Sequence, residues 1–180
     1  MTGAPAGLRE LAWGAGVATE YHDTGGVRHE TAPDVLRALL ALLGLPAGDG
    51  AAIADSHRML HRRHWVGLVS PTTVCWSDAE AAIEVRRDAS AAEASVSGVI
   101  ALEDGTEQPF VASADDLVTI EQVEVDGVRR VSQRVPLGRL PLGAHRVQVE
   151  ADGRQEIGHV LVAPRLAPAP RRGWGVFAPV

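Results

Sequence analysis

The sequence predicts an α+β protein in which a small helical subdomain precedes an antiparallel, immunoglobulin-like β-sandwich. Apolar residues recur at helical spacing up to about Trp65 and alternate with polar residues after it, and such alternation is typical of strands with one buried face. The alternating half also contains three Asp-Gly pairs, which favour tight turns between antiparallel strands. The expected divisions are a helical subdomain at residues 1–65, a sandwich of about seven strands at residues 66–164, and a Pro-rich segment at residues 165–180.

Three helices are expected in the first subdomain. The first covers Leu8–Ala18, and Tyr21–Gly26 then forms a turn. Thr31 is expected to cap the second helix, which carries a wide leucine stripe and ends at Gly44. The third helix covers about residues 51–63. A helical core this small gains stability by packing on the region that follows it.

Seven segments of the second half alternate with period two and are expected to be strands. They are Thr72–Trp76, Ala82–Arg87, Ala94–Leu102, Leu117–Val125, Val128–Val135, Arg146–Glu150 and Arg154–Val162. The apolar phase shifts between Ile120 and Val123, which predicts a β-bulge. Asp152 and Gly153 lie between the last two segments and predict a two-residue hairpin turn.

One predicted strand has a clearly polar face. Arg130, Ser132 and Arg134 alternate with apolar and amide side chains along Val128–Val135. That face is therefore expected to be solvated or to contact a partner.

Composition restricts the classes of partner. With 46% hydrophobic residues the chain can build a core, and its net charge of −6 argues against nucleic acid and against an anionic membrane surface. Cys75 is the single cysteine, so an intrachain disulfide is excluded. The sequence shows neither a secretory signal nor an apolar run long enough to span a bilayer. We therefore expect a cytoplasmic protein.

Three histidines of the third predicted helix are candidate metal ligands. His57, His61 and His64 have i, i+4 and i+7 spacing, which brings them near one helix face. Three neighbouring arginines surround them with positive charge, which opposes a cation. We expect helix-face histidines at a domain boundary rather than a metal site, and no cofactor.

No residue of this chain is expected to be catalytic. The carboxylate pairs Glu103-Asp104 and Asp115-Asp116 fall in predicted turns, whereas glycoside hydrolysis needs two carboxyls facing each other across a cleft. Cys75 is expected to be a small buried side chain of a strand. Phosphate-binding glycine motifs and a nucleophile elbow are not found.

The four tryptophans, Trp13, Trp65, Trp76 and Trp174, are expected mainly to pack in the core. An indole ring can also stack on the apolar face of a sugar. Trp76 is the candidate substrate-binding residue, because the alternation of its strand could turn the ring outward.

Four segments carry a family resemblance, in the same order as in the family. They are ATEYHDTGGVRHETAPDVLRALLALLGLPA at residues 18–47, LPLGAHRVQVE at residues 140–150, HVLVAPRLAP at residues 159–168 and RGWGVFAPV at residues 172–180. Together they resemble the N-terminal extension of bacterial, actinobacterial-like 4-α-glucanotransferases, the amylomaltases of the MalQ type. Ala144 stands where that family usually has an aromatic residue. The last segment resembles the first strand of the family's catalytic barrel.

The resemblance implies a parent enzyme that transfers α-1,4-glucan segments between maltodextrins by a retaining, two-carboxylate mechanism in a (β/α)8 barrel. The barrel strands that hold those carboxylates are not part of this sequence. This region is then non-catalytic, and its expected partner is its own barrel. Two alternatives stay open: a β-sandwich module that binds maltodextrin or a glycogen-like glucan, and a free-standing interaction domain. A homodimer is also left open.

Overall fold

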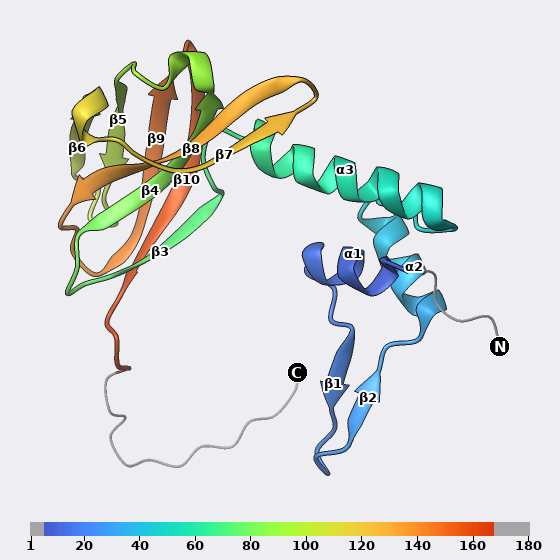
Figure 1. Cartoon of the computed structure of the whole chain (residues 1–180). Helices are drawn as coiled ribbons and strands as arrows, with labels where there is room; N and C mark the ends of the chain where they lie inside the picture. Colours follow the sequence, from blue (N-terminus) through green and yellow to red (C-terminus); the bar gives the residue numbers. More distant parts are fainter. Residues whose placement is uncertain (1–5, 168–180) are drawn as a thin grey trace, which may run out of the picture. The chain divides into compact units, whose positions relative to one another are not determined.

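The computed structural model describes residues 6–167 of the 180-residue chain (Figure 1). The chain divides into two compact units, Met1–Gly67 and Leu68–Val180. The first unit contains helices and a short hairpin, and the second contains a two-layered β-sandwich. The predicted fold class, α+β with helices followed by an antiparallel sandwich, is confirmed. Trp174 and nearly all of the predicted Pro-rich segment lie outside the described residues.

The described part of the first unit contains three helices, α1 (Leu8–Gly14), α2 (Pro33–Leu42) and α3 (Gly50–Val66). Helices as short as α1 and α2, with 7 and 10 residues, are marginal in water and depend on packing. They share one cluster of buried apolar residues: Leu8, Leu11, Ala12, Leu36, Leu40, Leu45, Ala47 and Ile53. Burial of each leucine is worth about 1.5–3 kcal/mol, so this cluster holds the unit together.

Glycines end the first two helices. Gly16 and Gly44 have φ values of 79° and 69°. In each case the next residue donates its amide hydrogen five positions back, Val17 to the Ala12 carbonyl and Leu45 to the Leu40 carbonyl. This pattern is the Schellman motif, in which the left-handed residue is usually glycine. The predicted end of α2 at Gly44 is confirmed, whereas α1 stops before Ala18 because Gly16 reverses the chain.

The N-terminal caps differ from the prediction in one place. Thr31 is not the cap of α2: Ala32 occupies that position, and the Thr31 hydroxyl donates to the Ala18 carbonyl at 2.9 Å. Thr31 therefore ties the segment before α2 to the segment after α1. Asp49 caps α3 by accepting a 2.8 Å hydrogen bond from the Ala52 amide.

A hairpin occupies the region that was predicted only as a turn. Strands β1 (Glu20–His22) and β2 (Arg28–Glu30) pair antiparallel, and the turn between them is held by the Asp23 carboxylate, which accepts hydrogen bonds from the Gly25 and Val27 amides at 2.9 Å. These strands are charged and aromatic rather than alternating, so periodicity did not reveal them.

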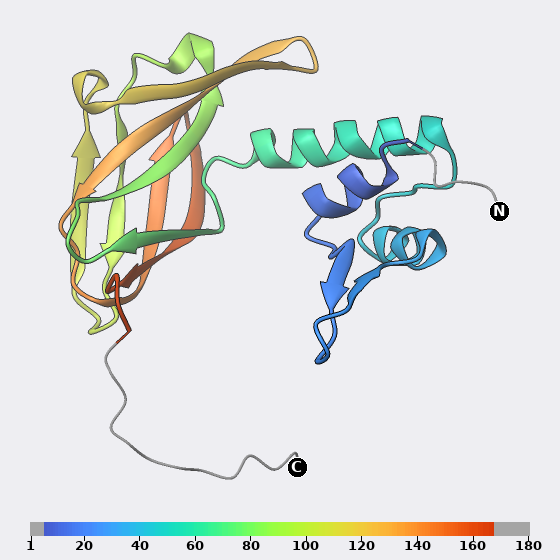
Figure 2. The same ribbon diagram turned by 60° about the horizontal axis from the view of Figure 1, so that its bottom comes forward.

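The second unit consists of two facing sheets (Figures 1 and 2). The five-stranded sheet has the order β3 (Thr72–Trp76), β10 (Arg154–Ala163), β9 (Gly143–Ala151), β5 (Val96–Ala101), β6 (Glu107–Ala112). The three-stranded sheet has the order β4 (Ala81–Asp88), β8 (Val128–Gly138), β7 (Val118–Val125). Single 3-10 turns lie at Ala89–Ala91 and Ala114–Asp116. All pairings are antiparallel except that of β3 with β10, which is parallel.

The core lies between the two sheets. Ile83, Val85 and Val135 enter it from the three-stranded sheet, and Val147 and Val160 enter it from the five-stranded sheet. Successive residues of a strand point to opposite faces, so these buried positions fix which residues face outward.

Two of the three Asp-Gly pairs form the predicted two-residue turns, whereas at Asp104-Gly105 only the glycine has a positive φ, 86°. Asp126 and Asp152 have φ values of 51° and 55°, and the glycine after each is also positive, which is the two-residue turn that suits a twisted hairpin. The register of β7 against β8 shifts between Thr119 and Glu121, so the predicted bulge is present at Ile120.

Strand β6 was not predicted, which gives the described sandwich eight strands rather than seven. Pro109 interrupts its sequence pattern, and proline cannot donate to a neighbouring strand. The strand forms because it lies at the edge of its sheet and needs hydrogen bonds on one side only.

Candidate functional site

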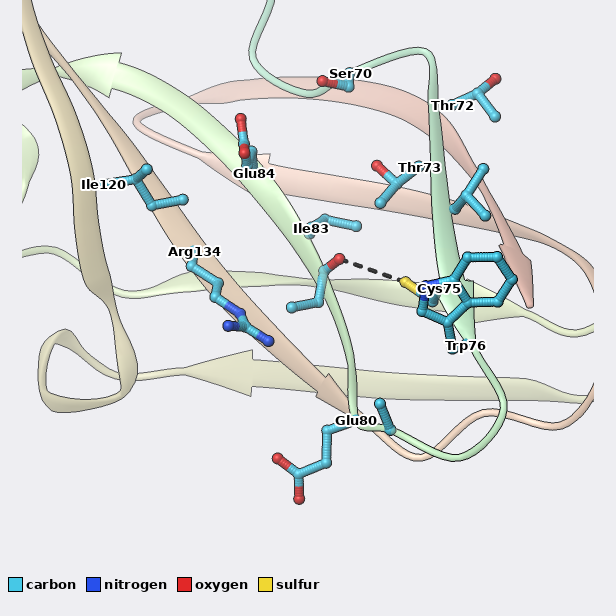
Figure 3. Close-up of a pocket in the computed structure, with 13 residues that line it drawn as sticks. Ser70, Thr72, Thr73, Cys75, Trp76, Glu80, Ile83, Glu84, Ile120 and Arg134 are labelled. Carbon is cyan, nitrogen blue, oxygen red and sulfur yellow. Dashed lines mark hydrogen bonds between the residues drawn. The ribbon is translucent and has the colours of Figure 1, made fainter. Parts of the chain in front are cut away.

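A groove of 520 Å³ opens where the edge strands of the two sheets, β3 and β4, run side by side. In Figure 3, Ile120 and Arg134 lie on one side of β4, and Thr73 and Trp76 lie on the other. Pockets for small ligands commonly measure about 300–1,000 Å³, so the groove has room for one.

Strand β3 turns Trp76 outward. Its register with β10 pairs Cys75 with Val162 and Trp76 with Ala163. Cys75 and Val162 are both buried, so the next residue along the strand belongs to the opposite face. Trp76 is accordingly 41% exposed and presents its indole ring to the groove.

The opposite wall comes from the three-stranded sheet. Glu84 of β4 and Arg134 of β8 are register partners, and both lie on the outer face. The bulge in β7 leaves Ile120 outside the regular register, with its side chain exposed and lining the groove. A bulge commonly re-aims a side chain in this way.

The floor of the groove is closed by contacts between the two edge strands. The Cys75 thiol donates a 3.7 Å hydrogen bond to the Ala82 carbonyl, and Ile83 is buried beneath it (Figure 3). Ser70 lines one end of the groove, where its hydroxyl accepts a 2.8 Å hydrogen bond from the buried guanidinium of Arg86. Burial lowers the pKa of Arg86, and Glu84 is the first of the carboxylates that oppose this shift.

A third arginine, Arg165, lies over the Trp76 ring. The guanidinium of Arg165, two residues beyond β10, is 5.6 Å from the centre of the Trp76 ring. Its Nε donates to the Asp78 carboxylate at 2.6 Å. We call this contact of Arg165 with Asp78 and Trp76 the clasp.

The groove therefore combines an exposed aromatic ring with side chains that donate and accept hydrogen bonds. Glu80 and Glu84 offer acceptors, Arg134 offers a planar set of donors, and the hydroxyls of Thr72 and Thr73 offer both. This combination suits a ligand that has an apolar face and a polar rim.

The three candidate metal ligands occupy separate places in the structure. The His57 Nε2 lies 3.4 Å from the Gly7 carbonyl oxygen, whereas the rings of His61 and His64 lie 6.4 and 5.9 Å from that of Trp65. Within residues 6–167, no group of three or more His, Cys, Asp or Glu side chains is arranged to hold a metal ion.

The described tryptophans have different environments. Trp65 is 2% exposed, in keeping with a core role, but Trp13 is 73% exposed and the expectation that it packs in the core is wrong. Leu8, Leu11 and Ala12 form the buried face of α1, and Trp13 lies on the other face.

Sequence reasoning singled out Trp76 as a candidate but did not identify the residues around it. Arg134 could be identified as outward-facing from the alternation of β8, but its pairing with Glu84 depends on sheet order. The clasp joins residues 76–78 to Arg165, almost ninety positions away (165 − 78 = 87). No local pattern signals such a contact.

Residues 68–164 match the sequence profile of the MalQ N-terminal beta sandwich domain. This match covers more than half of the chain. The chain belongs to the MalQ N-terminal β-sandwich domain family. The family assignment agrees with the observed sandwich and with the resemblance noted in four separate segments.

Relatives of this MalQ N-terminal domain are larger proteins. The chain is 30% identical over 182 residues to proteins named 4-alpha-glucanotransferase from Mycobacterium bovis and Mycobacterium tuberculosis, with 98% of this chain and 24% of each relative covered. The crystal structure of amylomaltase from Corynebacterium glutamicum is similar with a TM-score of 0.62 and 29% identity, over 87% of this chain and 22% of that one. The chain thus spans about a quarter of the length of the curated relatives that it matches.

Within residues 6–167, no helix is both long enough and apolar enough to cross a membrane.

Proposed function

We propose that this chain is the non-catalytic N-terminal region of a 4-α-glucanotransferase and that its sandwich packs on the catalytic barrel of the same protein. The parent enzyme transfers α-1,4-glucan segments between maltodextrins. The proposal is supported by the names of the relatives and by their length, since three quarters of each relative lies outside the matched region.

The observation that carries the packing role is an apolar patch on the outer face of the five-stranded sheet. Val74 and Leu161 are register partners on that face, with exposures of 58% and 39%, and Ile157 lies on the same face of β10. Ala144 is the register partner of Leu161 on the other side. An exposed patch built from regular strand positions is typical of an interface.

The rest of that face is mixed, with the apolar Val99 and Val111 among polar residues. Arg146 and Gln148 of β9 and Glu107 of β6 line a shallow depression on the same side of the sheet. The proposed contact is centred on the edge formed by β3 and β10, where Val74, Ile157 and Leu161 are exposed on adjacent strands. That edge also carries the chain into the residues that follow β10.

A binding experiment with the two parts of the parent protein tests the packing role. The chain and the separately expressed catalytic region should co-purify, and Leu161→Asp should abolish the complex because it buries a charge in the contact. Val111→Asp, on the far edge strand, is the matched control and should leave the complex intact. Equal retention of both variants, or a homodimer that buries Leu161 instead, would overturn this role.

Activity of the chain alone is a separate test. Incubation with maltotriose should give no disproportionation products. Measurable turnover would contradict the non-catalytic assignment.

A second function, glucan binding by the sandwich, is favoured by one observation. Trp76 is exposed in a groove that also offers a guanidinium, two carboxylates and hydroxyls. Titration with maltoheptaose should change the tryptophan fluorescence and the amide shifts of β3 and β4. If the spectra of the wild-type chain and of the Arg165→Ala variant are both unchanged at millimolar sugar, this second function is overturned.

A further inference from the structure

We infer that the groove between β3 and β4 is a maltodextrin-binding site in which Trp76 is the stacking platform, and that Arg165 and Asp78 form a clasp over this ring that the sugar must displace. This inference rests on the second function proposed above. It adds the residues that bind the ligand and a contact, the clasp, that lowers the affinity of the groove for the ligand.

The platform is Trp76. A glucose ring presents aliphatic hydrogens on its face and hydroxyls on its rim, so it stacks on an indole while its rim needs hydrogen bonds. The Trp76 ring is held at the end of a short strand whose next residue inward, Cys75, is fixed to β4 by its thiol. A ring on such a support needs little reordering to receive a ligand.

The rim partners lie along the groove in two positions. Glu80 lies at the end occupied by Trp76, and Glu84 lies toward the end occupied by Ser70 (Figure 3). The Arg134 guanidinium extends toward the Trp76 end from the neighbouring strand. Carboxylates accept from sugar hydroxyls and the guanidinium donates to them, so successive glucose units can be held along β4.

Arg165 competes with the sugar for the ring. Its guanidinium lies over the ring, 5.6 Å from the ring centre, and so covers a face on which a pyranose could stack. The 2.6 Å ion pair with Asp78 holds it there, but the side chains of Arg165 and Asp78 are 60% and 56% exposed. Exposed ion pairs and cation–π contacts are weak, so a ligand that stacks on Trp76 can displace the clasp.

The clasp gives an unusual expectation: removal of a charged residue next to the site should strengthen binding. Arg165→Ala should lower the Kd for maltoheptaose by about two- to fivefold, the factor that corresponds to an exposed cation–π contact. Asp78→Asn should act in the same direction, because it frees Arg165 from the position over the ring.

The decisive experiment is a titration of the whole chain with maltoheptaose, followed by calorimetry and by amide shifts. Trp76→Ala should weaken binding by about tenfold and Trp76→Tyr should retain most of it, since stacking needs an aromatic ring. Trp13→Ala removes a more exposed indole, that of α1, and should leave the affinity unchanged. The amide spectrum of each variant shows directly whether the sandwich is folded.

Arg134 is tested against an arginine of the same strand. Arg134→Ala should raise the Kd because a donor to the sugar rim is lost, whereas Arg129→Ala, near the hairpin tip, should not. Equal effects of the two variants would indicate a general charge effect and would overturn the role of Arg134.

The outcomes separate this inference from the function on which it rests. Binding that survives Trp76→Ala would overturn this site and leave glucan binding by the sandwich standing. Failure of the wild type and Arg165→Ala alike to bind would overturn both. Weaker rather than tighter binding by Arg165→Ala would overturn the clasp.

Discussion

Two hairpins of this protein, β1–β2 and β9–β10, are stabilised by different interactions. In β1–β2 the strand residues are exposed or partly exposed, Arg28 pairs with Glu20, and Tyr21 stacks on His29 with ring centres 5.1 Å apart. In β9–β10 every second residue is buried, including Val147 and Val160. The first hairpin is stabilised by surface charges and the second by the core.

The two hairpins also differ in their ion pairs. Arg87 is fully buried and donates through Nε and Nη2 to the Asp152 carboxylate at the β9–β10 turn, while its Nη1 donates to the Ala94 carbonyl at 2.9 Å. The pair joins the two sheets of the sandwich. Arg28 and Glu20 are about half exposed, and water and salt screen such pairs. The environment of a charge pair therefore decides its effect on stability more than its geometry does.

The largest effect is expected from breaking the buried pair. Arg87→Met should lower the free energy of unfolding of the sandwich by about 3 kcal/mol, because it leaves the Asp152 carboxylate without its partner. Urea unfolding, with hydrogen exchange at the β9 and β10 amides as the readout, measures this loss. Adding Asp152→Asn should recover part of it by removing the unpaired charge, and no recovery would contradict the electrostatic explanation.

A smaller loss is expected from overpacking in β10. A Cβ atom on Gly158 would lie 2.8 Å from the Ser70 carbonyl oxygen, so Gly158→Ala should cost about 1–3 kcal/mol. His159→Ala, the exposed neighbour on the same strand, is the control and should leave the unfolding midpoint in place. A Gly158→Ala variant as stable as the wild type would show that the Ser70 segment moves away freely.

The two turns allow a matched comparison. Gly26 in the first hairpin and Gly153 in the second have φ values of 79° and 71°, and neither has an atom within 4 Å of an added Cβ. Alanine at either position should cost about 1–2 kcal/mol of backbone strain. Gly153→Ala should lower the stability of the whole sandwich, whereas Gly26→Ala should speed hydrogen exchange only in β1–β2 and leave global unfolding unchanged. Equal global effects would mean that the first hairpin is also part of a cooperative core.

The smallest effect is expected from acid on the first hairpin. The side-chain hydrogen bond with His29 and the amides of Val27 and Gly25 hold the pKa of Asp23 below its ordinary value of 3.8. A lowered pKa contributes stability above pH 3.8, and this contribution is lost as the pH falls through the lower, folded value. Between pH 5 and pH 2, contacts between the Tyr21 and His29 rings should weaken in the NMR spectrum while those of β9–β10 persist. An Asp23→Asn variant should show a smaller acid transition, and what remains comes from Glu20, whose pKa is also lowered by its hydrogen bond with Arg28.

The sequence predicted most of the sandwich because its signals are local. Asp126-Gly127 and Asp152-Gly153 determine their turns, and the alternation of β9 and β10 reveals which residues are buried. Strand β6 was missed because Pro109 disrupts the pattern and only an edge position makes it acceptable. The β1–β2 hairpin was missed because its strands are exposed and charged, so apolar and polar residues do not alternate along them.

The groove could be predicted only in part, for the same reason. The alternation of its strand is enough to suggest that Trp76 faces outward. Its neighbours were not predictable, because β3 pairs with β10 across more than 80 residues, and this parallel pairing places Trp76 beside Ala163 and within reach of Arg165 (159 − 72 = 87 at the first pair).

By itself the sequence determined the periodicity of apolar residues in helices and strands, the turns and the family. These depend on residues that are adjacent or evenly spaced along the chain. The tertiary structure alone decided the sheet order, the buried pairing of Arg87 with Asp152, the groove that brings Trp76 and Arg134 together, and the contact of Arg165 with Trp76. These features join residues that are far apart in the chain, and their contacts form only after the core has fixed which strands are neighbours.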